Sequence, residues 1–258
     1  VISHTYLASA PTAEWQQGML DLSADNGGMS IQDQAYQSSN RTSVTVSNTG
    51  SDTNQGSPLS SLASIQAGIN AVVAGGKVNV AAGTYAASGE IDVNKSLTLA
   101  GAGVGSTIIN CSSSGYGMFV DADDVTLSGF TLNGPAAGTY GIKVQPNPSG
   151  YSPSDRLLDF TIENVAINGS KKTGLDLNGV TGATIDHVTV SNTTNGNGIA
   201  LTYRANVTLT NNTTANNAWS GLALYQTNTV YDQQVNNIVV DGTNTLNDTI
   251  PVYAEDQS

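Results

Sequence analysis

Residues 174–224 read GLDLNGVTGATIDHVTVSNTTNGNGIALTYRANVTLTNNTTANNAWSGLAL and contain one short motif three times. A glycine followed by an apolar, a variable and an apolar residue occurs at 174–177, 198–201 and 221–224, at intervals of 24 and 23 residues. Runs of alternating apolar and polar residues lie between these motifs, at 183–190 and 207–214. A repeat of about 20–30 residues built from short strands and turns rich in Asn, Gly and Thr is typical of a β-solenoid.

Both patterns continue outside this stretch. The glycine motif also occurs at 117–120 and 141–144, and 251–254 has the same pattern with proline in place of glycine. Alternating runs occur at 125–132, 160–167 and 238–245. Side chains alternate between the two faces of a strand, so the apolar residues of successive coils should stack inward about 4.8 Å apart. Asparagine recurs near the turn after the second strand, where its tolerance of positive φ suits a structural role, at Asn133, Asn168, Asn192 and Asn216.

The segment before the repeat has a different pattern. Apolar residues at Leu62, Ile65, Ile69 and Val72 are spaced by three or four, which predicts an amphipathic helix over about 60–74. Serines can cap its start, and two glycines follow its end. Residues 1–43 do not join the repeat. We therefore predict an N-terminal arm over 1–43 and a parallel β-helix domain over 44–258.

The start of this domain resembles a known family. Residues 47–103, SNTGSDTNQGSPLSSLASIQAGINAVVAGGKVNVAAGTYAASGEIDVNKSLTLAGAG, are similar to the N-terminal part of right-handed parallel β-helix proteins of the pectate-lyase-like superfamily. In these proteins a short helix covers the first coil. The resemblance implies an all-β fold, a right-handed parallel β-helix (β-solenoid) with a short capping α-helix. It does not decide function, because this fold carries lyases, hydrolases, epimerases, tail spikes and adhesins.

The composition excludes several classes of partner. The chain has 258 residues, a net charge of −12 and only 11% charged residues. This acidity disfavours nucleic acid and anionic membrane surfaces as partners, and no apolar run reaches the roughly 18 residues of a membrane span. The lone Cys111 is expected to be a buried apolar residue and allows no disulfide within the chain. The first residue is Val1, which is consistent with a processed form, and we expect a secreted protein, extracellular or at the cell surface.

The variable position of the glycine motif should face outward and form a ladder along the helix. In this ladder Lys143 and Asp176 fall on adjacent coils, which predicts an exposed ion pair that contributes about 0–1 kcal/mol. Two longer repeats add residues near 145–158 and 225–235, on the same side of the helix. Tyrosines there suit sugar rings, although packing within the loops is an equal alternative. The residues in question are Lys143, Asp176, Tyr203 and Arg204 as catalytic residues of an enzyme, and Tyr151, Tyr225 and Tyr231 as ligand-binding residues.

Other candidate sites are weaker. The turn with Asp121, Asp123 and Asp124 offers carboxylates to calcium, which would be the only cofactor, but a solvated acidic turn explains it as well. His187 beside Asp186 is interpreted as a turn residue rather than a general base. Nine Asn-x-Ser/Thr triplets occur, and the excess over the roughly six that the composition produces by chance decides nothing about glycosylation. The candidate sites are Asn40, Asn168, Asn192, Asn206, Asn211 and Asn247.

Two functions remain open. The first is an extracellular structural or adhesive β-helix that self-associates end to end, through the N-terminal arm and an uncapped C-terminal coil. The second is a polysaccharide lyase or C5-epimerase that binds an extended sugar chain along the helix. The family's epimerase motif Asp-Pro-His-Glu and the Gly-His-Gly and Arg-Ile-Lys motifs of polygalacturonases are absent, which favours the first. Ice binding is disfavoured, because Thr189, Thr208 and Thr213 look too scattered for a regular array.

Overall fold

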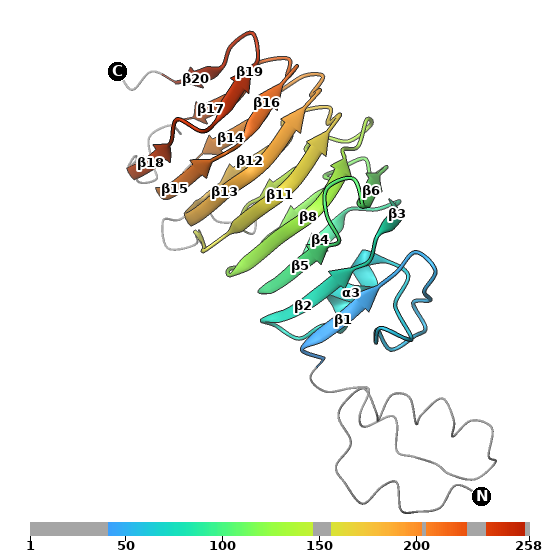
Figure 1. The fold of residues 1–258 in the computed structure, drawn as a ribbon. Coiled ribbons are helices and arrows are strands. Elements are labelled where there is room, and N and C mark those ends of the chain that lie inside the picture. The colour runs from blue at the N-terminus through green and yellow to red at the C-terminus, as the bar shows by residue number, and fades with distance from the viewer. Residues whose placement is uncertain (1–40, 147–155, 203–204, 226–235, 256–258) are drawn as a thin grey trace, which may run out of the picture.

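The chain winds into a stack of short parallel strands, with a helix at one end (Figure 1). The computed structural model describes residues 41–146, 156–202, 205–225 and 236–255. Within these ranges there is one α-helix, α3, and there are two sheets, one of 13 strands and one of seven. Every strand pair within them is parallel, as the β-helix prediction requires. None of the described segments is a helix long and apolar enough to cross a membrane.

We call the two sheets the large sheet and the small sheet. The strands of the large sheet are β1 (Ser43–Val46), β2 (Gly76–Val80), β3 (Gly83–Ala87), β5 (Leu97–Gly101), β6 (Thr107–Cys111), β8 (Val125–Asn133), β10 (Leu157–Leu158), β11 (Thr161–Asn168), β13 (Val180–Ser191), β15 (Ala205–Thr210), β16 (Thr213–Ala215), β18 (Asn236–Val240) and β19 (Thr245–Asn247). Those of the small sheet are β4 (Ile91–Val93), β7 (Met118–Val120), β9 (Ile142–Val144), β12 (Leu175–Asn178), β14 (Ile199–Thr202), β17 (Leu222–Tyr225) and β20 (Val252–Ala254).

The core lies between the two sheets and consists of apolar columns. Each coil places one side chain directly above the equivalent side chain of the coil before it, about 4.8 Å away. One such column of the large sheet runs through Val78, Leu99, Leu127, Ile162, Ile185, Leu209 and Val240. The glycine motifs supply the corresponding columns of the small sheet, so the stacking predicted from the repeat is confirmed.

The capping helix is shorter than predicted. α3 spans Ile65–Ala71, with Ser64 as its N-cap, and not residues 60–74. The reason lies in Leu62, which forms a parallel bridge to Val46 and whose N–H donates to Thr45 O at 3.0 Å, so that Leu62 pairs with β1 and is not helical. Gly68 lets the helix approach the first coil closely, because a Cβ there would lie 2.6 Å from Val46 Cγ2. Gly83 and the residues after it form β3 directly after β2.

The outer surface of the large sheet carries an ordered column of threonines. Strand register places Thr126 beside Thr161, which lies beside Thr184. The column continues to Thr98 at one end and to Thr208 at the other. Of the threonines interpreted as scattered, only Thr208 belongs to this column. The positions two residues further along the strands carry Ser128, Glu163, Asp186 and Thr210, so the described strands form a single threonine column and no regular Thr-x-Thr array.

Candidate functional site

The outer face of the small sheet brings together Lys143, Asp176 and Tyr225, the predicted catalytic and ligand-binding residues that the structure describes. We use "outer face" for two columns of side chains that point away from the core. The first column consists of Asp92, Phe119, Lys143, Asp176, Ala200, Ala223 and Tyr253. The second column, two residues further along each strand, consists of Asp121, Gln145, Asn178, Thr202 and Tyr225. The glycine spacing therefore predicted the order of the ladder correctly.

An ion pair lies at the centre of the outer face. Lys143 Nζ donates to Asp176 Oδ2, which confirms the predicted pairing. The prediction that the pair is exposed was wrong, because the two side chains are only 5% and 8% exposed. The ring of Tyr140 covers the ammonium group, with its centroid 4.9 Å from Nζ. Burial raises the pKa of Asp176, and the charge of Lys143 opposes that shift.

Two alanines beside the pair are also buried although the sequence pattern places them on the outward side. Ala200 and Ala223 occupy outward positions as predicted, yet both are buried. The sequence pattern identifies which way a side chain points, but it does not show what covers it. The centre of the first column is therefore buried, whereas Asn178 and Thr202 of the second column are partly exposed.

Aromatic rings occupy both ends of the outer face. At the N-terminal end Tyr116 stacks on Phe119, with 5.3 Å between ring centroids, and lies 5.6 Å from Tyr140. At the C-terminal end Tyr225 and Tyr253 are 5.7 Å apart. Tyrosine and phenylalanine rings of this kind offer flat apolar surfaces with polar edges, which suit sugar rings.

Sequence reasoning missed part of this aromatic set. Tyr116 and Tyr140 each directly precede the glycine of a repeat, so the sequence already indicated that the two rings occupy equivalent positions on successive coils. Trp219, two residues before the glycine of β17, is another such edge residue and is 53% exposed. Tyr225 was predicted, and its hydroxyl accepts from Asn197 Nδ2 at 3.0 Å.

Two carboxylates lie at the N-terminal end of the outer face. Asp92 pairs in register with Phe119, and Asp121 follows the same strand. Burial and the nearby charge of Asp92 raise the pKa of Asp121. The Oδ1 atom of Asp121 is buried and, within the described residues, has no hydrogen-bond partner.

The proposed calcium turn does not form as a cluster. Asp123 Oδ1 accepts from the Leu158 N–H at 2.8 Å, and Asp124 adopts a left-handed backbone with φ of 53°. In the described part of the chain, no three His, Cys, Asp or Glu residues lie together in a way that could hold a metal ion. The pKa of Asp121 is raised by burial and by the charge of Asp92 on the preceding coil.

Other predicted residues fall outside the described ranges. These are Tyr151, Tyr203, Arg204, Tyr231 and Asn40. The remaining glycosylation candidates lie on the surface, where several take part in side-chain ladders. Asn192 donates to Asn168 at 2.7 Å, Asn168 donates to Asn133 at 3.4 Å, and Asn211 donates to Asp186 at 2.8 Å. Asn206 accepts from Asn237 at 3.1 Å, and Asn247 is exposed in β19.

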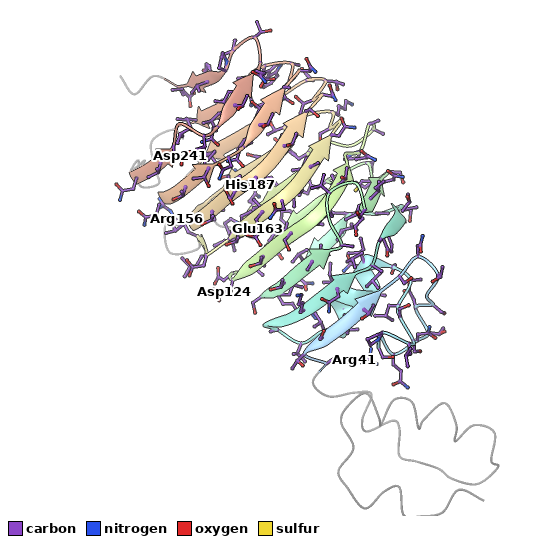
Figure 2. All side chains as sticks on the ribbon, viewed as in Figure 1. Arg41, Asp124, Arg156, Glu163, His187 and Asp241 are labelled. Atoms are coloured by element: carbon purple, nitrogen blue, oxygen red, sulfur yellow. The ribbon has the colours of Figure 1, made fainter. Side chains whose placement is uncertain are left out.

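A hydrogen-bonded group lies on the opposite side of the molecule, on the large sheet. Figure 2 shows His187 and Glu163 on this surface. Asp186 Oδ1 accepts from Thr210 Oγ1 at 2.6 Å and from Asn211 Nδ2 at 2.8 Å, and Asp186 Oδ2 lies 2.8 Å from His187 Nδ1. These hydrogen bonds lower the pKa of Asp186 to about 2. His187 has a left-handed backbone with φ of 51°, as expected for a turn residue.

This group predicts an acid-dependent contribution to stability. Because the pKa of Asp186 falls from 3.8 to about 2 on folding, its carboxylate stabilises the fold above pH 3.8, and this contribution is lost as the pH falls through about 2. We expect Asp186→Asn to cost about 1 kcal/mol or less near neutral pH, since the group is partly solvated. Urea unfolding of both proteins at several pH values should show the difference closing as the pH approaches 2. Asp124→Asn, at an exposed turn, is the control, and a constant gap for Asp186→Asn would contradict the assignment.

A pocket of about 530 Å³ lies at the N-terminal end of the β-helix, between the start of α3 and β3. Two of its lining side chains are bonded to the protein backbone. Gln66 bonds the backbone of Asp92 on both sides, at 2.8 and 3.1 Å, and Tyr85 donates to Ala81 O at 2.9 Å. These contacts explain how the first coil is held.

Comparison with known proteins bears on the fold. Residues 102–249, more than half of the chain, match the family model described as right handed beta helix region. No curated protein matches the sequence. Among solved structures, the chain is similar to the pectate lyase Pel9A, with 18% identity, a TM-score of 0.52 and coverage of 79% of this chain and 63% of that one.

Two further structures are less similar. The A-module of the Azotobacter vinelandii mannuronan C-5 epimerase AlgE4 has 21% identity, a TM-score of 0.49 and coverage of 62% of this chain and 54% of that one. ORF18 of Geobacillus virus E2 has 17% identity, a TM-score of 0.45 and coverage of 62% and 37%. The chain thus spans less than two thirds of the length of each of these proteins. At such identities the likeness shows the fold alone, which agrees with the parallel coils and the family match: this chain belongs to the right-handed β-helix family, with the pectate-lyase-like fold.

Proposed function

We propose that this protein is an extracellular, adhesive β-helix that binds an extended glycan along the outer face of the small sheet without cleaving it. The observation that supports this most is the placement of aromatic rings at both ends of one column. Phe119 and Tyr253 are separated by five strand steps of about 4.8 Å, or roughly 24 Å. A single extended chain of several sugar rings would contact both ends.

The centre of the outer face favours binding over catalysis. A catalytic lysine or carboxylate must reach the reacting atoms of its substrate. Lys143 and Asp176 are buried and bound to each other, so each would first have to leave its partner. The raised pKa of the Asp121 and Asp176 carboxyl groups is the observation that favours the enzyme alternative, because perturbed groups gather at active sites.

The binding proposal predicts a loss of affinity when the end rings are removed. We expect Phe119→Ala and Tyr253→Ala each to weaken binding about tenfold, which corresponds to about 1.4 kcal/mol of lost stacking. Calorimetry with hexasaccharides of glucose, N-acetylglucosamine, glucosamine and galacturonate would measure this. Val239→Ala is the matched control, because Val239 is 52% exposed but lies on the large sheet.

Two results would overturn the proposal. One is the absence of binding to every hexasaccharide and to the corresponding polymers, and the other is unchanged affinity in both ring variants. The same incubations also test the alternative. Release of an unsaturated product from the galacturonate sugar, or a change in sugar composition, would indicate a lyase or an epimerase instead.

We also propose self-association through the coil that contains β18, β19 and β20. Large apolar side chains of this coil are exposed, including Val240 at 41%, Ile250 at 47% and Val252 at 47%. Stacking of a second copy there would bury this surface. At the opposite end α3 and the segment around Leu62 cover β1, which makes a tail-to-tail contact better supported than the end-to-end filament. Sedimentation should show a concentration-dependent dimer that Val252→Asp abolishes, and a monomer at all concentrations would contradict this.

A further inference from the structure

The chain contains six Asn-Gly pairs, of which five lie within the described residues, at 133–134, 168–169, 178–179, 195–196 and 197–198. Asparagine is a chemically labile residue. It is most labile before glycine, which has no side chain to shield its backbone nitrogen from the preceding side-chain amide. In a folded chain that nitrogen must also be free, because an N–H held in a hydrogen bond has to be released first. The fold therefore decides which of the five pairs can react.

Four of the five glycines donate their backbone N–H to the next coil. The acceptors are the carbonyl oxygens of Asn168 for Gly134, at 2.7 Å, of Ser191 for Gly169, at 3.0 Å, of Thr202 for Gly179, at 2.9 Å, and of Ser220 for Gly198, at 2.8 Å. These hydrogen bonds join successive coils, so the nitrogens become free only when the coils separate locally. The fold protects these four pairs.

Gly196 is the exception. Its N–H has no hydrogen-bond acceptor among the described groups. Residues 194–196 form a bend in the turn between β13 and β14, where Asn195 is exposed. The Asn195 side chain makes no hydrogen bond within the part of the chain that the structure describes. Both the attacking nitrogen and the amide that it attacks are therefore free.

The next pair in the same turn provides the sharpest contrast. Asn197 is only 2% exposed. Its amide donates to Tyr225 Oη at 3.0 Å and accepts from Ser220 Oγ at 2.8 Å. The two pairs have the same sequence and lie two residues apart, yet the structure holds one of them and leaves the other free.

We propose that Asn195 is a site of spontaneous deamidation in the folded protein, an inference independent of the proposed function. The Gly196 nitrogen forms a bond to Asn195 Cγ and loses its proton, and the side-chain nitrogen leaves as ammonia. One water molecule then opens the resulting cyclic imide at either of its two carbonyl groups. The product is aspartate, or isoaspartate, in which the main chain runs through Cγ. Water is the only co-reactant.

The isoaspartate product would disturb the contacts of this turn. Gly196 O accepts from Thr193 Oγ1 at 2.8 Å and from the Trp219 N–H at 3.0 Å. A Cβ on Gly196 would lie 2.6 Å from backbone atoms of Lys172 and Thr173, so the turn packs tightly against the preceding coil. Isoaspartate lengthens the main chain by one CH₂ group directly before Gly196. We therefore expect the modification to strain the hydrogen bond that joins this turn to the exposed Trp219.

The test is incubation of the folded full chain at mildly alkaline pH, followed by proteolysis and mass spectrometry. Fragment spectra locate the amide-to-acid mass increase at Asn195 or at Asn197, and a methyltransferase specific for isoaspartate labels that product. We expect Asn195 to react at least tenfold faster than Asn197, since a factor of ten needs only about 1.4 kcal/mol of opening free energy at the protected pair. In concentrated urea, where the fold is lost, the two rates should become similar.

Variants assign the reaction to this asparagine. Asn195→Gln should abolish the isoaspartate signal of this turn, because the longer side chain closes the ring far less readily. Asn94→Gln, at an exposed asparagine that no glycine follows, is the matched control and should leave the signal unchanged. Circular dichroism before and after incubation shows that the protein stays folded. Equal rates at Asn195 and Asn197 in the folded protein, or a reaction at Asn195 only in urea, would overturn the inference.

Discussion

Replacement of Lys143 by methionine is expected to lower the free energy of unfolding by about 3–5 kcal/mol near neutral pH. The substitution keeps a long side chain but leaves the Asp176 carboxylate buried, at 8% exposure, without its partner. Removing one member of a buried pair is costly because the remaining charge loses its compensation while it stays out of water. Urea-induced unfolding, followed by circular dichroism, would measure the change.

Two controls distinguish this explanation from a general packing defect. Lys172→Met replaces an exposed lysine near the same Tyr140 ring and should change stability by less than about 0.5 kcal/mol. The double variant Lys143→Met with Asp176→Leu removes both charges, and it should recover most of the loss or exceed the wild type. A double variant as unstable as Lys143→Met alone would contradict the charge-based account.

The pH dependence of the Lys143→Met variant provides a third check. Burial raises the pKa of Asp176, and in the wild type Lys143 opposes that shift. Without Lys143 the pKa should rise further, so the carboxyl group becomes protonated at a higher pH. A group with a raised acidic pKa destabilises the fold only while it is ionised. The deficit of the variant should therefore shrink as the pH falls.

Replacement of Phe130 by alanine is expected to cost about 3–5 kcal/mol of unfolding free energy. Phe130 lies in β8 with no exposed surface and stacks beside Val165 of the next coil. In a solenoid each coil is stabilised mainly by its neighbours, so a cavity at Phe130 weakens two interfaces at once. Chemical denaturation would give the loss from the transition midpoint and slope.

Phe119 provides the matched control, because it is a phenylalanine of β7, the strand that precedes β8 in the chain, and its side chain points outward. Phe119→Ala removes the same atoms from a half-buried position and should cost clearly less stability than Phe130→Ala. In the glycan assay Phe119→Ala should lose more affinity than Phe130→Ala, since only Phe119 belongs to the proposed site. Equal losses of stability would mean that the outer face contributes to the fold as much as the core does.

Much of the fold could be predicted from the sequence because its signal is periodic. The glycine motif recurs once per coil, so counting between glycines predicts which residues become neighbours. This predicted the contact between Lys143 and Asp176, which are 33 residues apart. The bounds of α3 were less accurate, because Leu62 satisfies a helical spacing and yet pairs with Val46 of β1.

The candidate site was predicted only in part. Period-two alternation correctly assigned Lys143, Asp176 and Ala200 to the outward side. Their burial depends on groups such as the Tyr140 ring, which come from other parts of the coil. The charge environment of Asp121 likewise depends on Asp92, which belongs to the preceding coil and was not part of the predicted ladder.

The sequence alone determined that this chain is a parallel β-helix, which residues point into its core and which outward positions stack on one another. These properties follow from local alternation and a constant repeat, and both can be read along the chain. Only the tertiary structure decided which outward residues are covered, that Lys143 and Asp176 form a buried pair, and that Asp92, Phe119 and Asp121 meet at one end of the outer face. Such properties arise from side chains of different coils, whose separation in sequence varies with the insertions between them, whereas their separation in space is set by the constant spacing of hydrogen-bonded strands.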